Sequence, residues 1–416
     1  MRKKGSPTVA LVISTGLVAT LVLYAVIWLK LHERVASGRV DFISCYTAGK
    51  ILIAGKGSEL YNLKLQSQVQ QSLLKGHVFE GGVLAYVHPP FQALVFLPFS
   101  YLSFPVAYSA WSVFMSALGL LSISFLLKLP HYQALRPWST QIFLATFCFF
   151  PVFISLVQGQ DSLMLLFFIA WAFTLLKQKR DTQAGIVLAC ALFKFHLVLI
   201  IYGVLLVKKR WRVIRGSIYS SLGLLVLSYA TVGFTGIVDY VKLVSQMASW
   251  TDRYNFNPLQ MRNLRGMLTL LLGGNPPMVT WLSLILGVFV LAITLKAWKG
   301  PWDASDRKFD LQFSLSVVAG LLVGHYLYSH DQSILVLPLF ILLSIAQNGS
   351  KTLRTGIFLL LILANPALMF AFIEFGRLRV PINVVYLLVL FVSFVYLAAR
   401  KLEVEKPPQG VYTLVT

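Results

Sequence analysis

The chain is built from uninterrupted apolar stretches, each about as long as a membrane-spanning helix. They cover residues 8–29, 105–128, 139–157, 160–176, 213–234, 278–296, 311–327, 332–347, 355–372 and 380–399. A helix needs about 20 apolar residues to cross a bilayer. A soluble protein of 416 residues needs a charged surface, yet only 12% of these residues are charged, which is about half the usual share. The sequence excludes a soluble enzyme and a disordered protein, and it predicts an all-α, polytopic integral membrane protein.

A further apolar run, 182–207, lies between the basic clusters Lys177–Arg180 and Lys208–Arg212. Because basic clusters stay on the cytoplasmic side, this run is expected to leave the cytoplasmic face and return to it. The polar midpoint, Lys194-Phe195-His196, would form the turn between two short helices. With these two arms the count is about 12 transmembrane helices.

The distribution of Lys and Arg gives the expected orientation. With the N-terminus inside, the inside segments hold 22 of the 36 Lys and Arg residues, and the short outside turns hold three. This bias predicts that both termini are cytoplasmic. It also accounts for the net charge of +21 without nucleic acid, because no basic stretch matches a nucleic-acid-binding motif.

The chain is expected to form one transmembrane domain over residues 1–416. Its expected parts are a first helix at 8–29, an outer loop at 30–104, helices two to seven over 105–234, a second outer loop at 235–277, helices eight to twelve over 278–399, and a cytoplasmic tail at 400–416. Residues 63–74 are amphipathic and are predicted to lie along the membrane surface. Residues 89–102 are apolar but short, and we interpret them as a re-entrant or interfacial helix.

Ionisable and amide side chains gather at the expected outer ends of these helices. They are Asp41, His88, Gln158, Gln160, Asp161, Lys194, His196, Arg262, Asn263, Arg265, His325, His330 and Asp331. Such groups at membrane depth are costly and indicate function, and their convergence from separate turns predicts one shared site. Structural roles stay open: Asp161 and Asp331 could cap the following helices. His88 could be a packed residue of a turn. Lys194 and His196 could simply be the water-exposed polar residues of a turn.

Motifs for other kinds of site are missing from the sequence. Neither glycine-rich phosphate-loop pattern occurs, so no nucleotide-binding domain is expected. The three cysteines, Cys45, Cys148 and Cys190, are far apart and indicate neither a disulfide network nor a zinc site. We therefore predict no metal and no cofactor.

An ordered set of motifs resembles glycosyltransferase family 87, also described as domain of unknown function family 2029. The motifs are Asp41-Phe42-Ile43 with Tyr46-Thr47-Ala48-Gly49 and Leu60-Tyr61, then Tyr86-Val87-His88-Pro89-Pro90-Phe91, Gln158-Gly159-Gln160-Asp161, Ala184-Gly185 with Phe193-Lys194-Phe195-His196 and Lys208 to Trp211, Asn263-Leu264-Arg265-Gly266, and Ser329-His330-Asp331. They cover nearly the whole chain in the expected order.

The resemblance implies a GT-C fold with its active site on the outer face of a bacterial cytoplasmic membrane. Similar proteins include α-mannosyltransferases that use polyprenyl-phosphate mannose. The resemblance therefore implies transfer of a sugar, mannose being expected, from a polyprenyl-phosphate donor to a lipid-linked or cell-envelope glycan acceptor. In the family the acidic residue of the first outer loop is the base, and it corresponds to Asp41 here.

The residue chemistry is consistent with such a transferase. Asp41 would be the general base for the acceptor hydroxyl, and cations would stabilise the phosphate leaving group. Candidates for binding the donor phosphate or sugar are Lys194, His196, Arg262, Asn263, Arg265, His330 and Asp331. Further pocket candidates are His88, Gln158, Gln160, Asp161 and His325. One base and one phosphate clamp are what an inverting single displacement requires.

Two other classes of protein stay open. A lipid or solute transporter, or a flippase, would also bury ions among its helices, but it predicts matching broken helices in two related halves. The run 182–207 is one such segment, and we find no second. A scaffold protein would tolerate Asp41→Asn, whereas an enzyme that uses this base would not.

Overall fold

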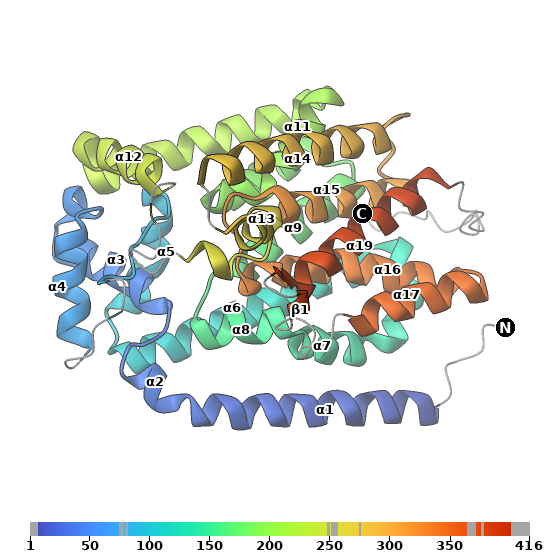
Figure 1. The fold of residues 1–416 in the computed structure, drawn as a ribbon, viewed down its shortest axis with the longest axis horizontal. Coiled ribbons are helices and arrows are strands. Elements are labelled where there is room, and N and C mark those ends of the chain that lie inside the picture. Colours follow the sequence, from blue (N-terminus) through green and yellow to red (C-terminus); the bar gives the residue numbers. More distant parts are fainter. Residues whose placement is uncertain are drawn as a thin grey trace, which may run out of the picture.

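The computed structural model describes residues 7–74, 79, 82–247, 250, 257–273, 276–363, 372–375 and 378–400. These residues are almost all helical (Figure 1). Their strands are β1 (Phe372–Phe375) and β2 (Leu378–Pro381), an antiparallel pair in which Phe372 lies opposite Pro381. The predicted class, an all-α polytopic membrane protein, is confirmed.

Judged by length and composition alone, seven of the described helical runs could cross a membrane, or up to eight if one bent pair is a single span. The seven are α1 (Pro7–Lys30), α6 (Phe104–Lys128), α10 with α11 (Asp181–Cys190 and Phe195–Val207), α12 (Trp211–Met247), α14 (Pro276–Ala297), η5 with α16 (Ser329–Leu335 and Val336–Asn348) and α19 (Ile382–Ala399). The count of about 12 stays a prediction.

Shorter helices fill the space between these runs. They are α2 (His32–Ala36), α3 (Phe42–Ile53), η1 (Gly57–Glu59), α4 (Leu63–Leu73), α5 (Pro90–Ser100), η2 (Pro130–Trp138), α7 (Ser139–Cys148), α8 (Phe150–Gln158), α9 (Ser162–Lys177), η3 (Ala191–Lys194), η4 (Pro258–Gln260), α13 (Leu264–Leu271), α15 (Arg307–Val323) and α17 (Lys351–Leu363). The amphipathic segment and the short apolar segment of the first loop thus both form helices, α4 and α5. Of the predicted helix 355–372, residues 364–371 lie outside the described residues.

Two differences from the sequence-based prediction are larger than a few residues at a helix end. The predicted helix 139–157 bends by 57° between α7 and α8, where Pro151 occupies the first turn of α8 and cannot continue the preceding helix. The second outer loop, predicted over 235–277, begins with a helix, because α12 continues to Met247 beyond a break at Gly233.

The run 181–207 reverses its direction, as its flanking charges predict. The guanidinium of Arg210, just after α11, forms an ion pair with the carboxylate of Asp181, which begins α10. A straight helix of this length would separate the two ends by about 40 Å. The reversal therefore places the turn residue Lys194 beside Ser162, at the start of α9.

Helices α9 and α15 lie in the hydrophobic core. Phe173 of α9 packs on Phe309 and Phe313 of α15, with ring centroids 6.1 and 5.0 Å away. The last residue of α9, Lys177, forms a buried ion pair with Asp310 at 2.7 Å. By contrast, α1 runs along the edge of the bundle with its side chains mostly exposed (Figure 1). These contacts fix the last turns of α9 against α15.

Candidate functional site

A cavity of about 640 Å³ lies where the chain turns before α3, α9, α11 and η5. Ten of the predicted site residues line it: Asp41, His88, Gln158, Gln160, Lys194, His196, Arg262, His325, His330 and Asp331. Its apolar wall consists of Leu84, Ala85, Val87, Ile154, Phe193, Phe195, Val244 and Met247, next to Tyr240. One hollow thus combines charged, amide and apolar surfaces.

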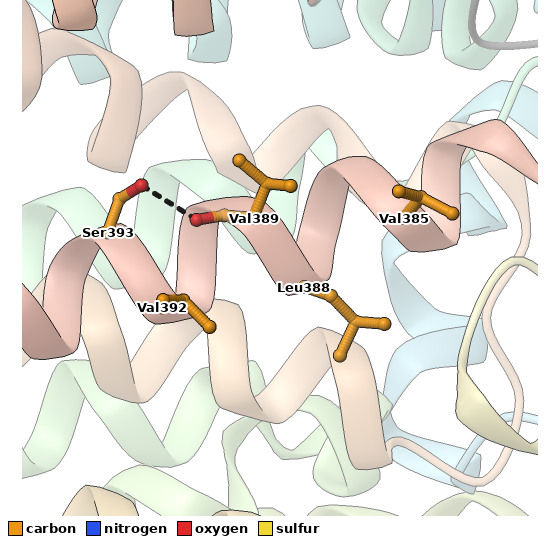
Figure 2. A pocket seen from close by; sticks show the side chains of 5 residues that line it. All are labelled: Val385, Leu388, Val389, Val392 and Ser393. Carbon is orange, nitrogen blue, oxygen red and sulfur yellow. Dashed lines mark hydrogen bonds between the residues drawn. The ribbon is translucent and has the colours of Figure 1, made fainter.

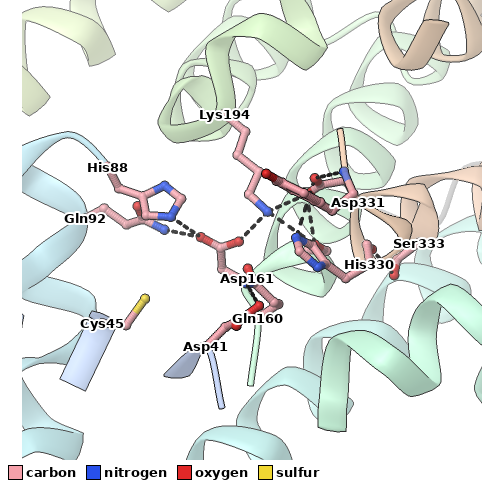
Figure 3. A network of polar contacts seen from close by, with 12 residues as sticks. Asp41, Cys45, His88, Gln92, Gln160, Asp161, Lys194, His330, Asp331 and Ser333 are labelled. Carbon is pink, nitrogen blue, oxygen red and sulfur yellow. Dashed lines mark hydrogen bonds and ion pairs between the residues drawn. The ribbon is translucent and has the colours of Figure 1, made fainter. Parts of the chain in front are cut away.

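Lys194 joins three turns of the chain through a buried ion network. Its Nζ lies 2.6 Å from Oδ1 of Asp161 and 2.6 Å from Oδ1 of Asp331 (Figure 3). It also donates to Oγ of Ser162 at 3.2 Å. The side chains of Lys194 and both aspartates are at most 6% exposed. Because buried charges must be paired, this network ties the starts of α9 and η5 to the turn at η3.

The remaining contacts of the two aspartates separate their roles. Asp331 accepts from the backbone N–H of Tyr328 at 3.1 Å, which is a capping bond of the kind that the sequence left open. The Asp161 side chain makes no such bond to α9. Instead it accepts from Nε2 of Gln92 and lies 3.8 Å from Nε2 of His88. Burial lowers the pKa of His88, so this imidazole is neutral at neutral pH.

Asp41 is held differently from the other two carboxylates. Its Oδ2 accepts from Nε2 of Gln160 at 2.8 Å. Among the described residues, no ion pair involves Asp41. Phe42, Ile43 and Tyr46 follow Asp41 and are at most 2% exposed, so they anchor this segment in the core. The cavity therefore contains one carboxylate that is bound by a neutral amide.

The imidazole of His330 faces the same hollow. Its Nδ1 lies 2.9 Å from Oε1 of Gln158, and an amide oxygen can only accept. Nδ1 therefore carries a hydrogen. Nε2 lies 3.5 Å from Oδ2 of Asp331, so the amide and the carboxylate together fix the plane of this ring.

Of the two predicted arginines, only Arg265 lies in a helix, because α13 begins at Leu264. Arg262 lines the cavity. Arg265 lies behind the lining, where its guanidinium contacts Nε2 of His325 and covers the ring of Tyr326 at 5.4 Å. The two arginines therefore reach the cavity in different ways, one directly and one through aromatic neighbours.

Asn263 has a structural position. Its Oδ1 accepts from the backbone N–H of Gly266 at 2.8 Å and caps α13. Its Nδ2 donates to the carbonyl oxygen of Gly324. Asn263 thus joins α13 to the end of α15, and it lies outside the cavity lining.

Sequence reasoning missed Gln92 and Ser162, although both contact the ion network. Gln92 lies fully buried in α5, an otherwise apolar helix that begins at Pro90. A single amide in such a segment is a usable signal, because a buried polar group needs a partner. Ser162 directly follows Asp161, and its hydroxyl had no feature that would distinguish it.

A second hollow, of about 280 Å³, lies on α19. It is lined by four aliphatic residues and by Ser393, whose Oγ donates to the carbonyl oxygen of Val389 within the same helix at 2.7 Å (Figure 2). The hollow thus has one hydroxyl, which is already bonded, and offers no chemistry.

Comparison with known proteins gives one match. The family model of glycosyltransferase family 87 matches residues 86–325, which is more than half of the chain. The match includes the cavity residues from His88 to His325 and leaves Asp41, His330 and Asp331 outside it. No curated protein and no solved structure matches the chain.

Proposed function

Because the chain belongs to glycosyltransferase family 87 and is a membrane glycosyltransferase, we propose that it uses a polyprenyl-phosphate sugar as donor. Mannose is the sugar that we expect. The acceptor is a lipid-linked or cell-envelope glycan. The reaction takes place on the outer face of the bacterial cytoplasmic membrane, with both termini in the cytoplasm.

The observation that carries this proposal is the contrast between Asp41 and the two carboxylates of the neighbouring ion network. Asp161 and Asp331 share the ammonium of Lys194, which lowers their tendency to take a proton. Asp41 is bound by the amide of Gln160 and lines the same cavity. Asp41 is therefore the carboxylate best suited to accept a proton from an acceptor hydroxyl.

The proposed reaction is a single displacement at the anomeric carbon. The acceptor oxygen attacks this carbon while its proton moves to Asp41. The bond from the anomeric carbon to the phosphate oxygen breaks, and its electron pair stays on the phosphate. Arg262 and His330 line the cavity, and the guanidinium of Arg262 can donate hydrogen bonds to this phosphate. The attack from the opposite side inverts the anomeric configuration.

The apolar wall of the cavity supports a donor with a lipid chain. Ile154, Val244 and Met247 line the hollow together with the charged residues. A nucleotide sugar would bring a base and a ribose that need polar partners, whereas an isoprenoid needs an apolar surface. The cavity offers both surfaces that a polyprenyl-phosphate sugar requires.

The test uses purified protein in nanodiscs with radiolabelled polyprenyl-phosphate mannose and a lipid and glycan extract of the bacterial envelope as acceptor. We expect label in a glycolipid or glycan fraction, and no label when GDP-mannose replaces the donor. The matched control is Asp41→Asn in the same nanodiscs. Movement of intact donor across the bilayer of proteoliposomes without formation of a labelled product would contradict the proposal and favour a transporter.

A further inference from the structure

The turn between α8 and α9 places one amide directly on Asp41. Gln160 Nε2 donates to Oδ2 of Asp41 at 2.8 Å (Figure 3). A carboxylate has two oxygens, and this bond occupies one of them. Because Asp41 also lines the cavity, its other oxygen, Oδ1, is left for a ligand.

The backbone of this turn is fixed from two sides. Gly159 has a φ of 66° and ends α8, and the backbone N–H of Gln160 donates to the carbonyl oxygen of Ser155 at 2.8 Å. The indole Nε1 of Trp111 donates to the carbonyl oxygen of Gly159 at 2.9 Å. The backbone that carries the side chain of Gln160 therefore has little conformational freedom.

The turn is also packed directly against the chain that carries Asp41. A Cβ at Gly159 would lie 2.6 Å from Cβ of Phe42, the residue after Asp41. Only glycine allows this approach, and its positive φ has the same requirement. The distance between Gln160 and Asp41 is thus set by backbone packing rather than by two long side chains.

We propose that Gln160 is the positioning residue of Asp41, an inference that rests on the proposed role of Asp41 as the base. The amide hydrogen bond fixes the plane of the carboxylate before the reaction. When Oδ1 takes the proton of the acceptor hydroxyl, Oδ2 becomes a carbonyl oxygen that still accepts from Gln160. No other group has to move.

A neutral partner suits this task better than a cation. An ammonium at hydrogen-bond distance, as Lys194 provides for Asp161 and Asp331, stabilises the carboxylate so strongly that it becomes a poor base. The amide of Gln160 orients the carboxylate without placing a positive charge next to it. The ammonium of Lys194 thus pairs with Asp161 and Asp331, whereas a neutral amide binds Asp41.

The test compares Gln160→Leu and Gln160→Glu with Gln71→Glu, a matched charge change on the exposed side of α4. For Gln160→Leu we expect kcat to fall about 10- to 100-fold, the scale of a misplaced catalytic group, with KM for the donor unchanged. For Gln160→Glu the two carboxylates repel, so the acid limb of the pH profile of kcat/KM should move up by about one unit or more. Gln71→Glu should keep the wild-type profile.

The outcomes distinguish this inference from the proposed function. A wild-type pH profile in Gln160→Glu, together with an inactive Asp41→Asn variant, overturns the positioning role and leaves the base in place. Near-normal transfer in Asp41→Asn overturns the proposed function itself. If Gln160→Leu does not fold, the pH profile of Gln160→Glu still decides, because a purely structural role would not move it.

Discussion

Lys194→Met tests whether this lysine is a structural counter-ion or a ligand of the donor phosphate. The side chain of Met is also long and unbranched, so the substitution mainly removes the ammonium. Nζ lies 2.6 Å from a carboxylate oxygen of both Asp161 and Asp331, and all three side chains are nearly buried. The variant would leave two buried carboxylates without a cation.

The expected loss follows from this geometry. Removing one partner of a buried ion pair costs about 3–5 kcal/mol. With an unfolding entropy of about 2.1 cal/mol/K per residue, this loss lowers Tm by about 3–6 °C for a chain of this length. The double variant Lys194→Met/Asp331→Asn restores the original net charge of the network and should regain part of the loss.

Thermal unfolding in detergent, followed by size-exclusion chromatography with fluorescence detection, measures this effect. Thr8→Met on the exposed surface of α1 serves as a control for the added Met side chain. A wild-type Tm for Lys194→Met, combined with weaker donor binding, would refute the structural role. It would return Lys194 to the phosphate clamp that the sequence suggested.

Three further predictions concern orientation, the cationic wall and pH. A cysteine at Ser72 should react with an impermeant thiol reagent added outside intact spheroplasts, and one at Gln178 should not; the reverse labelling would overturn the orientation. Arg262→Ala should weaken donor binding by about 1–3 kcal/mol, and equal donor affinity in the variant and the wild type would remove this residue from the clamp. Because burial lowers the pKa of His88, the free energy of unfolding should fall as pH drops below about 6.5. His88→Gln should reduce this loss between pH 7 and pH 5, and an unchanged loss would contradict it.

Charge and hydropathy were enough to predict the topology around 181–207. Two basic clusters at the ends of one apolar run required a reversal, and the pairing of Arg210 with Asp181 confirms it. The same rules missed the extension of α12, because the segment after Gly233 contains Asp239 and Lys242 and looks too polar to continue a membrane helix. Hydropathy is evaluated for one segment at a time, so it does not predict that a helix such as α12 continues into a polar segment.

It was easier to predict which residues lie at the cavity than to predict which of their side chains contact one another. Ten of the thirteen polar residues predicted at the expected outer turns line one cavity, whereas Asp161, Asn263 and Arg265 do not. Buried ionisable groups in a membrane protein need a shared polar environment. Lys194 was assigned to the donor phosphate, since a sequence does not tell which cation meets which carboxylate. That information depends on how α9, α11 and η5 meet. The same holds for Gln92, whose partner Asp161 lies on another helix.

The rate of sugar transfer by Asp41→Asn tests the central claim most directly. Asn has nearly the same shape as Asp but cannot accept a proton, so folding and donor binding should be retained. The rate with labelled polyprenyl-phosphate mannose should fall by about 100-fold or more, the contribution of a general base. Asp331→Asn, measured at a temperature at which it is folded, serves as the comparison. Near wild-type transfer by Asp41→Asn, with Asp331→Asn inactive, would contradict the claim and assign the base to Asp331.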